Sequence, residues 1–232
     1  MMVFLKQHSL ILLLTAASVF TFFWLYWQRQ RLVMKPYAVL IVTILHVLYG
    51  VFTVRLFAAM EGSPGGMSLF GAVFLMPAAY YAGARITRRP IAEVFDILTI
   101  CMVFTLLCAR VNCLISGCCL GRQISSHTQA RWPTRESELV FYIIFLIAAI
   151  PRVREGKTKG NVYPVYMAAY GAFRAVNECF RQSAASNSIF HLSHLWAVLT
   201  LCLGLSFLME MRKRTGTENH PKRKTRHKGA EK

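Results

Sequence analysis

Acidic residues, and charged residues in general, are scarce in this sequence. Asp and Glu number 10 among 232 residues, and charged residues make up 16% of the chain, whereas a soluble domain carries about a quarter. Hydrophobic residues make up 55%, which excludes a disordered basic protein, because disordered segments are poor in them. Lys and Arg nevertheless number 27, which leaves a formal net charge of +17.

The positive charges interrupt long apolar runs instead of lining one polar face. Because a nucleic-acid-binding domain shows the opposite pattern, no nucleic acid is expected as a partner. The composition favours an all-α, polytopic integral membrane protein. Seven apolar runs are separated by short segments that hold most of the Gly, Pro and charge. The predicted transmembrane helices are Ser9–Gln28, Pro36–Ala59, Gly66–Ala84, Asp96–Gly117, Ser137–Pro151, Tyr163–Phe180 and Ile189–Met209.

The first run, Ser9–Gln28, has the position of a signal peptide. It is about 20 residues long, which suits a helix that crosses the hydrocarbon core. Trp24, Tyr26 and Trp27 near its end match an aromatic belt at a membrane interface, and no small-residue cleavage site follows. We therefore interpret this run as a retained span.

Lys and Arg gather in alternate connecting segments. These segments are residues 29–35, 85–89, 152–159 and 211–232, and the last holds nine Lys and Arg. Together they hold 19 of the 27, and the positive-inside rule places them in the cytoplasm. The N-terminus is thus predicted outside and the C-terminus in the cytoplasm. Residues 1–210 are expected to form the membrane domain, and the remainder a disordered basic tail near anionic lipid.

Arg110 is not explained by this topology. It follows a stretch from Ile97 to Ala109 that has no charge, and more apolar residues follow it. An arginine at membrane depth normally faces a cavity, a partner or a ligand, because its charge is costly in hydrocarbon. The alternative is that the span ends there and the guanidinium reaches the outer interface.

Four polar residues in and directly after the sixth run recur at helical spacing. Tyr170, Arg174, Glu178 and Arg181 are separated by four, four and three positions, which places them on one helix face. Glu178 lies within reach of both arginines and can orient them, with net positive charge left for a ligand. A structural salt bridge is the alternative. Arginines in the outer half of a bundle suit a phosphate, and in a membrane this predicts a phospholipid head group.

Two segments resemble signatures of the prolipoprotein diacylglyceryl transferase family. Residues 110–122 (RVNCLISGCCLGR) have the length of the family's Arg-x-Gly-Asn-Phe-x-Asn-Gly-Glu-x-x-Gly-Arg signature. The positions kept there are Arg110, Gly117, Gly121 and Arg122. The family's Tyr-Gly-x-x-Arg-x-x-x-Glu-x-x-Arg signature is matched in full by Tyr170, Gly171, Arg174, Glu178 and Arg181.

Shorter matches occur in the same order along the chain. Gly66–Met67–Ser68 resembles the start of the family's Gly-Met-Ser-Phe-His-Gly-Gly loop. Pro133–Thr134, followed by Glu138, resembles a Pro-Ser/Thr-Gln-x-x-Glu segment that opens a span. Leu192–Ser193 resembles the Leu-Thr/Ser that opens the last helix.

The resemblance implies transfer of a diacylglyceryl group from phosphatidylglycerol to the lipobox cysteine of a prolipoprotein, with release of glycerol phosphate. It also implies a multi-pass protein of the bacterial cytoplasmic membrane in contact with membrane lipids, with no cofactor or metal. The expected catalytic residues are Arg110, Arg174 and Glu178. The expected substrate-binding residues are Tyr170, Arg181, Arg122, Gly117, Gly121, Ser68 and Glu138.

The sequence departs from the family at the loop histidine. Phe70 stands at that position, and Ala72 stands at the second glycine. If proton transfer is needed, the candidates predicted near the outer side are His127, His191 and His194.

Cysteines are the other departure. The chain has 7 of them, so complete intramolecular pairing is excluded. Cys113, Cys118 and Cys119 gather at the outward end of the fourth run, where they can pack as small residues, form a disulfide or act directly as thiols. A structural zinc site is the weaker alternative, because such sites usually have four ligands and a Cys-x2-4-Cys spacing.

Two functions follow from these observations. The first is a membrane transferase that acts on phosphatidylglycerol, with a prolipoprotein or another thiol as the acceptor. The second is a noncatalytic phospholipid-binding or lipid-moving protein that kept the arginines without the histidine.

Overall fold

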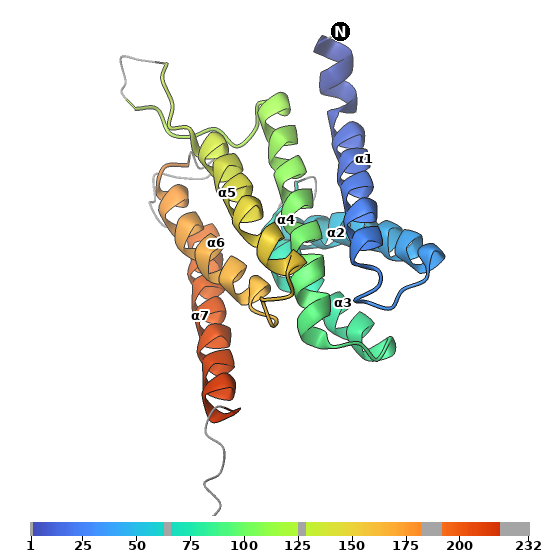
Figure 1. Cartoon of the computed structure of the whole chain (residues 1–232). Helices are drawn as coiled ribbons and strands as arrows, with labels where there is room; N and C mark the ends of the chain where they lie inside the picture. The colour runs from blue at the N-terminus through green and yellow to red at the C-terminus, as the bar shows by residue number, and fades with distance from the viewer. Residues whose placement is uncertain (1, 63–65, 125–128, 182–191, 219–232) are drawn as a thin grey trace, which may run out of the picture.

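The computed structural model describes residues 2–62, 66–124, 129–181 and 192–218, and over these residues it is all-helical (Figure 1). Side chains are described for residues 8–213 within those ranges. No strand occurs in this part of the chain, which has only two isolated bridges between loop residues. Its seven helices are α1 (Met2–Gln28), α2 (Pro36–Met60), α3 (Phe70–Ile86), α4 (Ile91–Ser116), α5 (Thr134–Arg154), α6 (Val162–Cys179) and α7 (Leu192–Glu218).

Over the described residues, each apolar run predicted from the sequence corresponds to one helix, so the all-α prediction is confirmed for this part of the chain. Four of the helices described, α1, α2, α4 and α7, contain segments long and apolar enough to cross a membrane. α3 has 17 residues, and α5 and α6 carry buried charged side chains. The helix α7 continues to Glu218, beyond the boundary expected at residue 210; residues 219–232 lie outside the described part of the chain.

Prolines and a glycine set several helix ends. Pro36 is the first residue of α2, where its fixed φ and missing N–H are tolerated. α4 begins after Pro90 and ends at Gly117, which has φ +73°. A residue in this left-handed conformation ends a helix, and glycine adopts it without steric cost.

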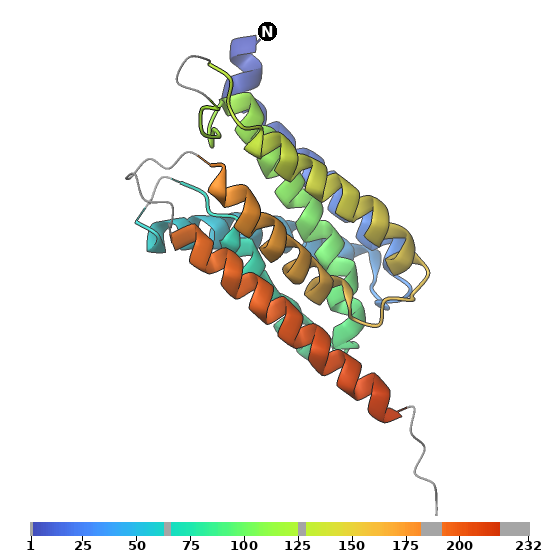
Figure 2. The same cartoon turned by 90° about the vertical axis from the view of Figure 1, so that its left-hand side faces the viewer.

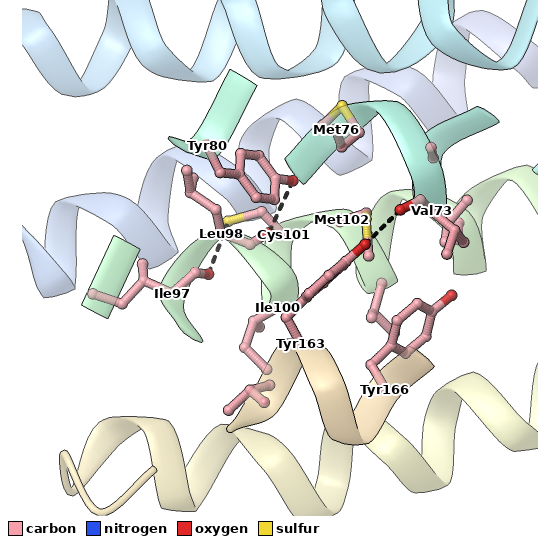
Figure 3. Packing of buried hydrophobic residues seen from close by; sticks show 14 of the residues in the cluster. Val73, Met76, Tyr80, Ile97, Leu98, Ile100, Cys101, Met102, Tyr163 and Tyr166 are labelled. Atoms are coloured by element: carbon pink, nitrogen blue, oxygen red, sulfur yellow. Dashed lines mark hydrogen bonds between the residues drawn. The ribbon is translucent and has the colours of Figure 1, made fainter. Parts of the chain in front are cut away.

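α4 lies at the centre of the bundle and packs against α1, α3, α5 and α6, while α7 packs on α6. Figure 3 shows the core where α3, α4 and α6 meet. There the Tyr80 hydroxyl donates to the Leu98 carbonyl at 3.3 Å, and the Tyr163 hydroxyl donates to the Val73 carbonyl. Aromatic side chains thus fill the interior and satisfy their polar ends on neighbouring helices.

The three cation-rich loops, residues 29–35, 85–89 and 152–159, lie at one end of the molecule, toward the lower right in Figure 2. Arg31, after α1, donates to the carbonyl of Val153 near the end of α5. Arg89, after α3, donates to the carbonyl of Val33 at 3.5 Å. The loop that connects α1 to α2 therefore contacts both other cation-rich connections.

Candidate active site

Buried charges form a connected chain across three helices. Glu138 of α5 accepts from Arg110 of α4 at 2.8 Å through one carboxylate oxygen and from Arg174 of α6 at 3.0 Å through the other. These side chains are at most 5% exposed. Because an unpaired charge inside a protein is very costly, each of the three groups depends on the others for its place in the core.

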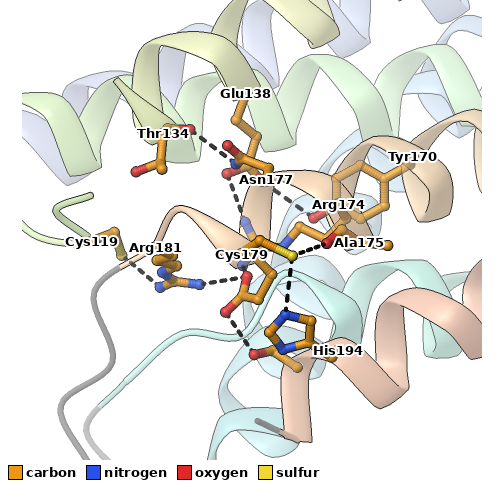
Figure 4. Close-up of polar contacts among 12 residues, drawn as sticks. Cys119, Thr134, Glu138, Tyr170, Arg174, Ala175, Asn177, Cys179, Arg181 and His194 are labelled. Atoms are coloured by element: carbon orange, nitrogen blue, oxygen red, sulfur yellow. Dashed lines mark hydrogen bonds and ion pairs between the residues drawn. The ribbon is translucent and has the colours of Figure 1, made fainter. Parts of the chain in front are cut away.

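Arg174 also continues the series of buried ion pairs along α6. Its Nη2 lies 2.9 Å from Glu178, four residues later, and Glu178 lies 3.6 Å from Arg181. Ser193 at the start of α7 donates to Glu178 at 2.6 Å. The predicted helical stripe therefore exists, and Figure 4 shows it between α5 and the start of α7. Three arginines alternate with two glutamates, which leaves one net positive charge.

Aromatic groups hold the central carboxylate and the arginine beside it. The hydroxyls of Tyr142 and Tyr170 each donate to Glu138 at 3.3 Å. The Arg174 guanidinium lies over the Phe70 ring, 5.8 Å from its centroid. Phe70 thus occupies the neighbourhood of the central arginine, where its ring supplies a cation–π contact and no proton-accepting atom.

A cavity of about 600 Å³ opens in front of these arginines. Predicted site residues that line it are Ser68, Arg110, Tyr170, Arg174 and Arg181. The Nε atoms of Arg110 and Arg174 are buried, and no residue in the described part of the chain accepts a hydrogen bond from them. The side chains of Arg110 and Arg174 both line the cavity, and guanidinium groups suit an anionic ligand with several acceptor oxygens.

Glu138 and Glu178 are not among the described residues that line the cavity. They lie behind the arginines and contact them, so the structure gives them a positioning geometry. Substrate contact by Glu138 and a catalytic role for Glu178 remain predictions.

The loop after α4 closes one side of the site through its backbone. Gly121 pairs with Arg181, and the Arg122 amide donates to the Phe180 carbonyl at 2.8 Å. A Cβ on Gly121 would lie 2.1 Å from the Trp132 carbonyl oxygen, so only glycine fits. Gly117 ends α4; neither Gly117 nor the half-buried Arg122 is among the described residues that line the cavity.

One predicted histidine can be placed. His194 lies 3.8 Å from the Cys179 thiol through Nε2 (Figure 4), and it is not among the described residues that line the cavity. His127 and His191 lie outside the described residues.

Further polar residues line the cavity, and two buried ones, His46 and Asn112, were missed by sequence reasoning. His46 of α2 lies with Nδ1 3.5 Å from the Tyr80 hydroxyl. Asn112 of α4 accepts from Ser9 of α1 at 2.7 Å. The sequence offered one signal for both residues, which is a polar side chain inside an apolar run. For Asn112, the position two residues after Arg110 was a second signal.

The three clustered cysteines line the same cavity. The sulfurs of Cys113, Cys118 and Cys119 all lie within 4.8 Å of one another, and Arg181 donates to Cys119 at 3.1 Å. A hydrogen bond from Cys113, together with the charges of Arg181 and Arg110, outweighs burial and lowers the pKa of Cys119 to about 4. Burial raises the pKa of Cys118. Of these two cysteines at the wall of the cavity, Cys119 is therefore the more acidic.

The fold and the site define a helical protein with helices able to span a membrane and an interior cavity lined by arginines. The profile of the prolipoprotein diacylglyceryl transferase family matches residues 28–210, a range that includes all the cavity arginines. The chain belongs to this family.

Curated relatives are similar at low identity. A phosphatidylglycerol–prolipoprotein diacylglyceryl transferase of Polaromonas naphthalenivorans is 27% identical over 136 residues, which cover 51% of this chain and 48% of the relative. A protein of the same name from Dehalococcoides mccartyi is 21% identical over 178 residues, with 65% and 68% covered. The chain thus spans about half the length of the first relative and two thirds of the second.

Proposed function

We propose that this protein transfers a diacylglyceryl group from phosphatidylglycerol to the lipobox cysteine thiol of a prolipoprotein. The products are a thioether and glycerol phosphate. The observation that carries the proposal is the Arg110–Glu138–Arg174 triad, whose two arginines line one cavity and are held in place by the same carboxylate.

The triad suits a reaction in which a phosphate is the leaving group. A thiolate attacks the glyceryl carbon, and the bond from that carbon to the phosphate oxygen breaks with its electron pair on the oxygen. Positive charge that is already in place where this oxygen gains charge lowers the barrier. Arg110 and Arg174 are held there by Glu138, so little reorganisation is needed during the reaction.

Arg181 and Tyr170 complete the site in this proposal. Arg181 reaches the same cavity from the end of α6 and contacts both Glu178 and Cys119. Tyr170 lines the cavity and anchors Glu138. Ser68 also lines the cavity, on the segment before α3.

The proposal includes seven spans in the bacterial cytoplasmic membrane, with the N-terminus outside and the C-terminus in the cytoplasm. Contacts among the cation-rich connections at one end of the bundle support this orientation. The cavity with its arginines and cysteines then opens toward the outer half of the membrane, where prolipoproteins present their lipobox.

Phe70 favours a second candidate, a noncatalytic phospholipid-binding or lipid-moving protein. Its ring stands where the family signature has a histidine and offers no proton acceptor beside Arg174. A protein of this kind would bind phosphatidylglycerol without breaking it.

One experiment separates the two candidates. Purified protein is incubated with phosphatidylglycerol labelled in its acyl chains and with a lipobox peptide, and a peptide with Ser for Cys is the control. Thioether product from wild type, and none from Arg174→Gln, supports the transferase. Lipid binding without product supports the second candidate. Complementation of a strain depleted of its own transferase then tests whether prolipoproteins are the acceptor in cells.

A further inference from the structure

The chain turns sharply after α4 and brings three sulfurs together. Gly117 has φ +73° and Cys119 has φ +57°, so two left-handed residues reverse the chain within a few positions. A non-glycine residue in this conformation is strained and persists only where its surroundings fix it. The turn carries Cys118 and Cys119 back over Cys113 in the last turn of α4, which the linear spacing does not reveal.

The sulfur positions fit one thiolate-preferring metal ion. The three atoms lie within 4.8 Å of one another. An ion with bonds of about 2.3 Å to sulfur holds thiolates roughly 3.8 Å apart in tetrahedral geometry, so small side-chain rotations would complete the site. Arg181, 3.1 Å from Cys119, offsets the negative charge of three thiolates around a divalent ion.

We propose that Cys113, Cys118 and Cys119 bind a zinc ion whose fourth position faces the cavity and takes the acceptor thiol. Three protein ligands with one open position are typical of catalytic zinc, whereas structural zinc has four. Within the described residues the group contains three ligands, and all three line the cavity that holds the arginines. The Cys-x4-Cys-Cys spacing is unusual for a structural zinc site with four ligands. It is compatible with a zinc site that has three protein ligands and one open position.

This inference rests on the proposed function and supplies its missing step, deprotonation of the acceptor. The acceptor thiol displaces the zinc-bound water, its S–H bond breaks as the sulfur binds zinc, and the proton passes to solvent water. The metal-bound thiolate then uses its lone pair to form the S–C bond, while the C–O bond breaks toward the phosphate held by the arginines. The neutral thioether is a weak ligand, and water replaces it on the ion.

Activation of the acceptor thiol by zinc fits the replacement of the family's loop histidine by Phe70 in this chain. Phe70 lines the same cavity as the cysteines and carries no proton acceptor. A metal that lowers the pKa of a bound thiol removes the need for a separate base. The cysteine cluster and Phe70 are thus complementary departures from the family signature.

Metal content tests the site independently of transfer. Protein is purified without oxygen in detergent with a phosphine reductant, supplied with zinc, desalted and measured by mass spectrometry of the metal. We expect about one zinc ion per chain, and a loss of affinity of roughly tenfold or more for Cys113→Ser and Cys119→Ser. Cys202→Ser removes an exposed cysteine of α7 and should keep the metal. Size-exclusion profiles and thermal unfolding verify that each variant is folded.

Cobalt substitution tests the open position. Co²⁺ should give thiolate-to-metal charge-transfer absorption that a cysteine lipobox peptide changes and the serine peptide does not. Absence of metal from wild type, or retention by the cluster variants equal to Cys202→Ser, overturns the site. An unchanged cobalt spectrum with the cysteine peptide overturns the thiol ligand. Neither measurement requires product, so failure of the transfer reaction is a separate result.

Discussion

Arg110 of α4 and Glu138 of α5 form an ion pair with 2.8 Å between Nη2 and Oε1, and both side chains are at least 95% buried. The other oxygen of the same carboxylate binds Arg174 of α6. One acidic side chain thus fixes two cavity arginines that come from different helices, and loss of Glu138 leaves Arg110 as an uncompensated charge in the interior.

Glu138→Ala should destabilise the fold. Removal of one partner from a buried ion pair costs about 3–5 kcal/mol; here Arg110 loses its carboxylate partner, while Arg174 keeps Glu178. Thermal unfolding in detergent measures the effect. Glu136→Ala is the matched control on the same helix, because its carboxylate is 48% exposed and lies 3.5 Å from Arg135, a pair worth about 0–1 kcal/mol. Equal effects of the two variants would contradict the account.

Arg174→Lys should lower kcat/KM by about 10²–10³, as loss of one donor to a developing oxyanion does. Lysine keeps the charge but cannot reach Glu138 and Glu178 with two separate nitrogens as Arg174 does. The transfer assay with labelled lipid measures the rate. Arg152→Lys, on the exposed end of α5, should leave the rate unchanged. Wild-type activity in Arg174→Lys would show that the forked geometry is not needed.

Gly171→Ala should destabilise the α6–α7 interface by about 1–3 kcal/mol, the usual cost of overpacking. A Cβ at this position would lie 2.4 Å from the Leu201 backbone nitrogen, so α7 would have to move. Gly83→Ala in α3 is the control, because a Cβ there meets nothing within 4 Å and alanine favours a helix. Thermal unfolding that ranks Gly83→Ala as the less stable variant would refute this packing.

Cys119 should remain reactive in acid when metal has been removed with a chelator. Its pKa is lowered to about 4, so the thiolate persists as the pH falls from 8 to 6. Burial raises the pKa of Cys118, so its thiolate fraction falls roughly tenfold per pH unit in this range. Alkylation followed by peptide mass spectrometry measures both cysteines in one chain. A parallel loss of labelling at the two positions would contradict the lowered pKa.

Much of the fold could be predicted because apolar runs of membrane-spanning length leave few alternatives to a helix. The Arg174–Glu178–Arg181 contacts were also predictable, since residues three and four apart share a helix face. Both predictions use local geometry. The seven-span topology and its orientation remain predictions, since four of the helices described meet the length and apolarity of a span.

Contacts between helices could not be predicted in the same way. The resemblance named Glu138 as a substrate-binding residue, but its contacts with Arg110 and Arg174 depend on how α4, α5 and α6 pack. His46 reaches the cavity from α2, and nothing in its sequence surroundings distinguishes it from an ordinary core histidine. The cysteine cluster depends on the left-handed turn at Gly117 and Cys119, which the residue spacing does not specify.

The central claim, that Arg110 and Arg174 bind the phosphate of a phospholipid, is tested most directly by lipid retention. Native mass spectrometry of the detergent-solubilised protein compares phosphatidylglycerol with diacylglycerol that has the same acyl chains and no phosphate. We predict that wild type retains phosphatidylglycerol in preference to diacylglycerol, and that folded Arg110→Gln and Arg174→Gln lose this preference. Equal retention of the two lipids by wild type, or an unchanged preference in both variants, would contradict the claim.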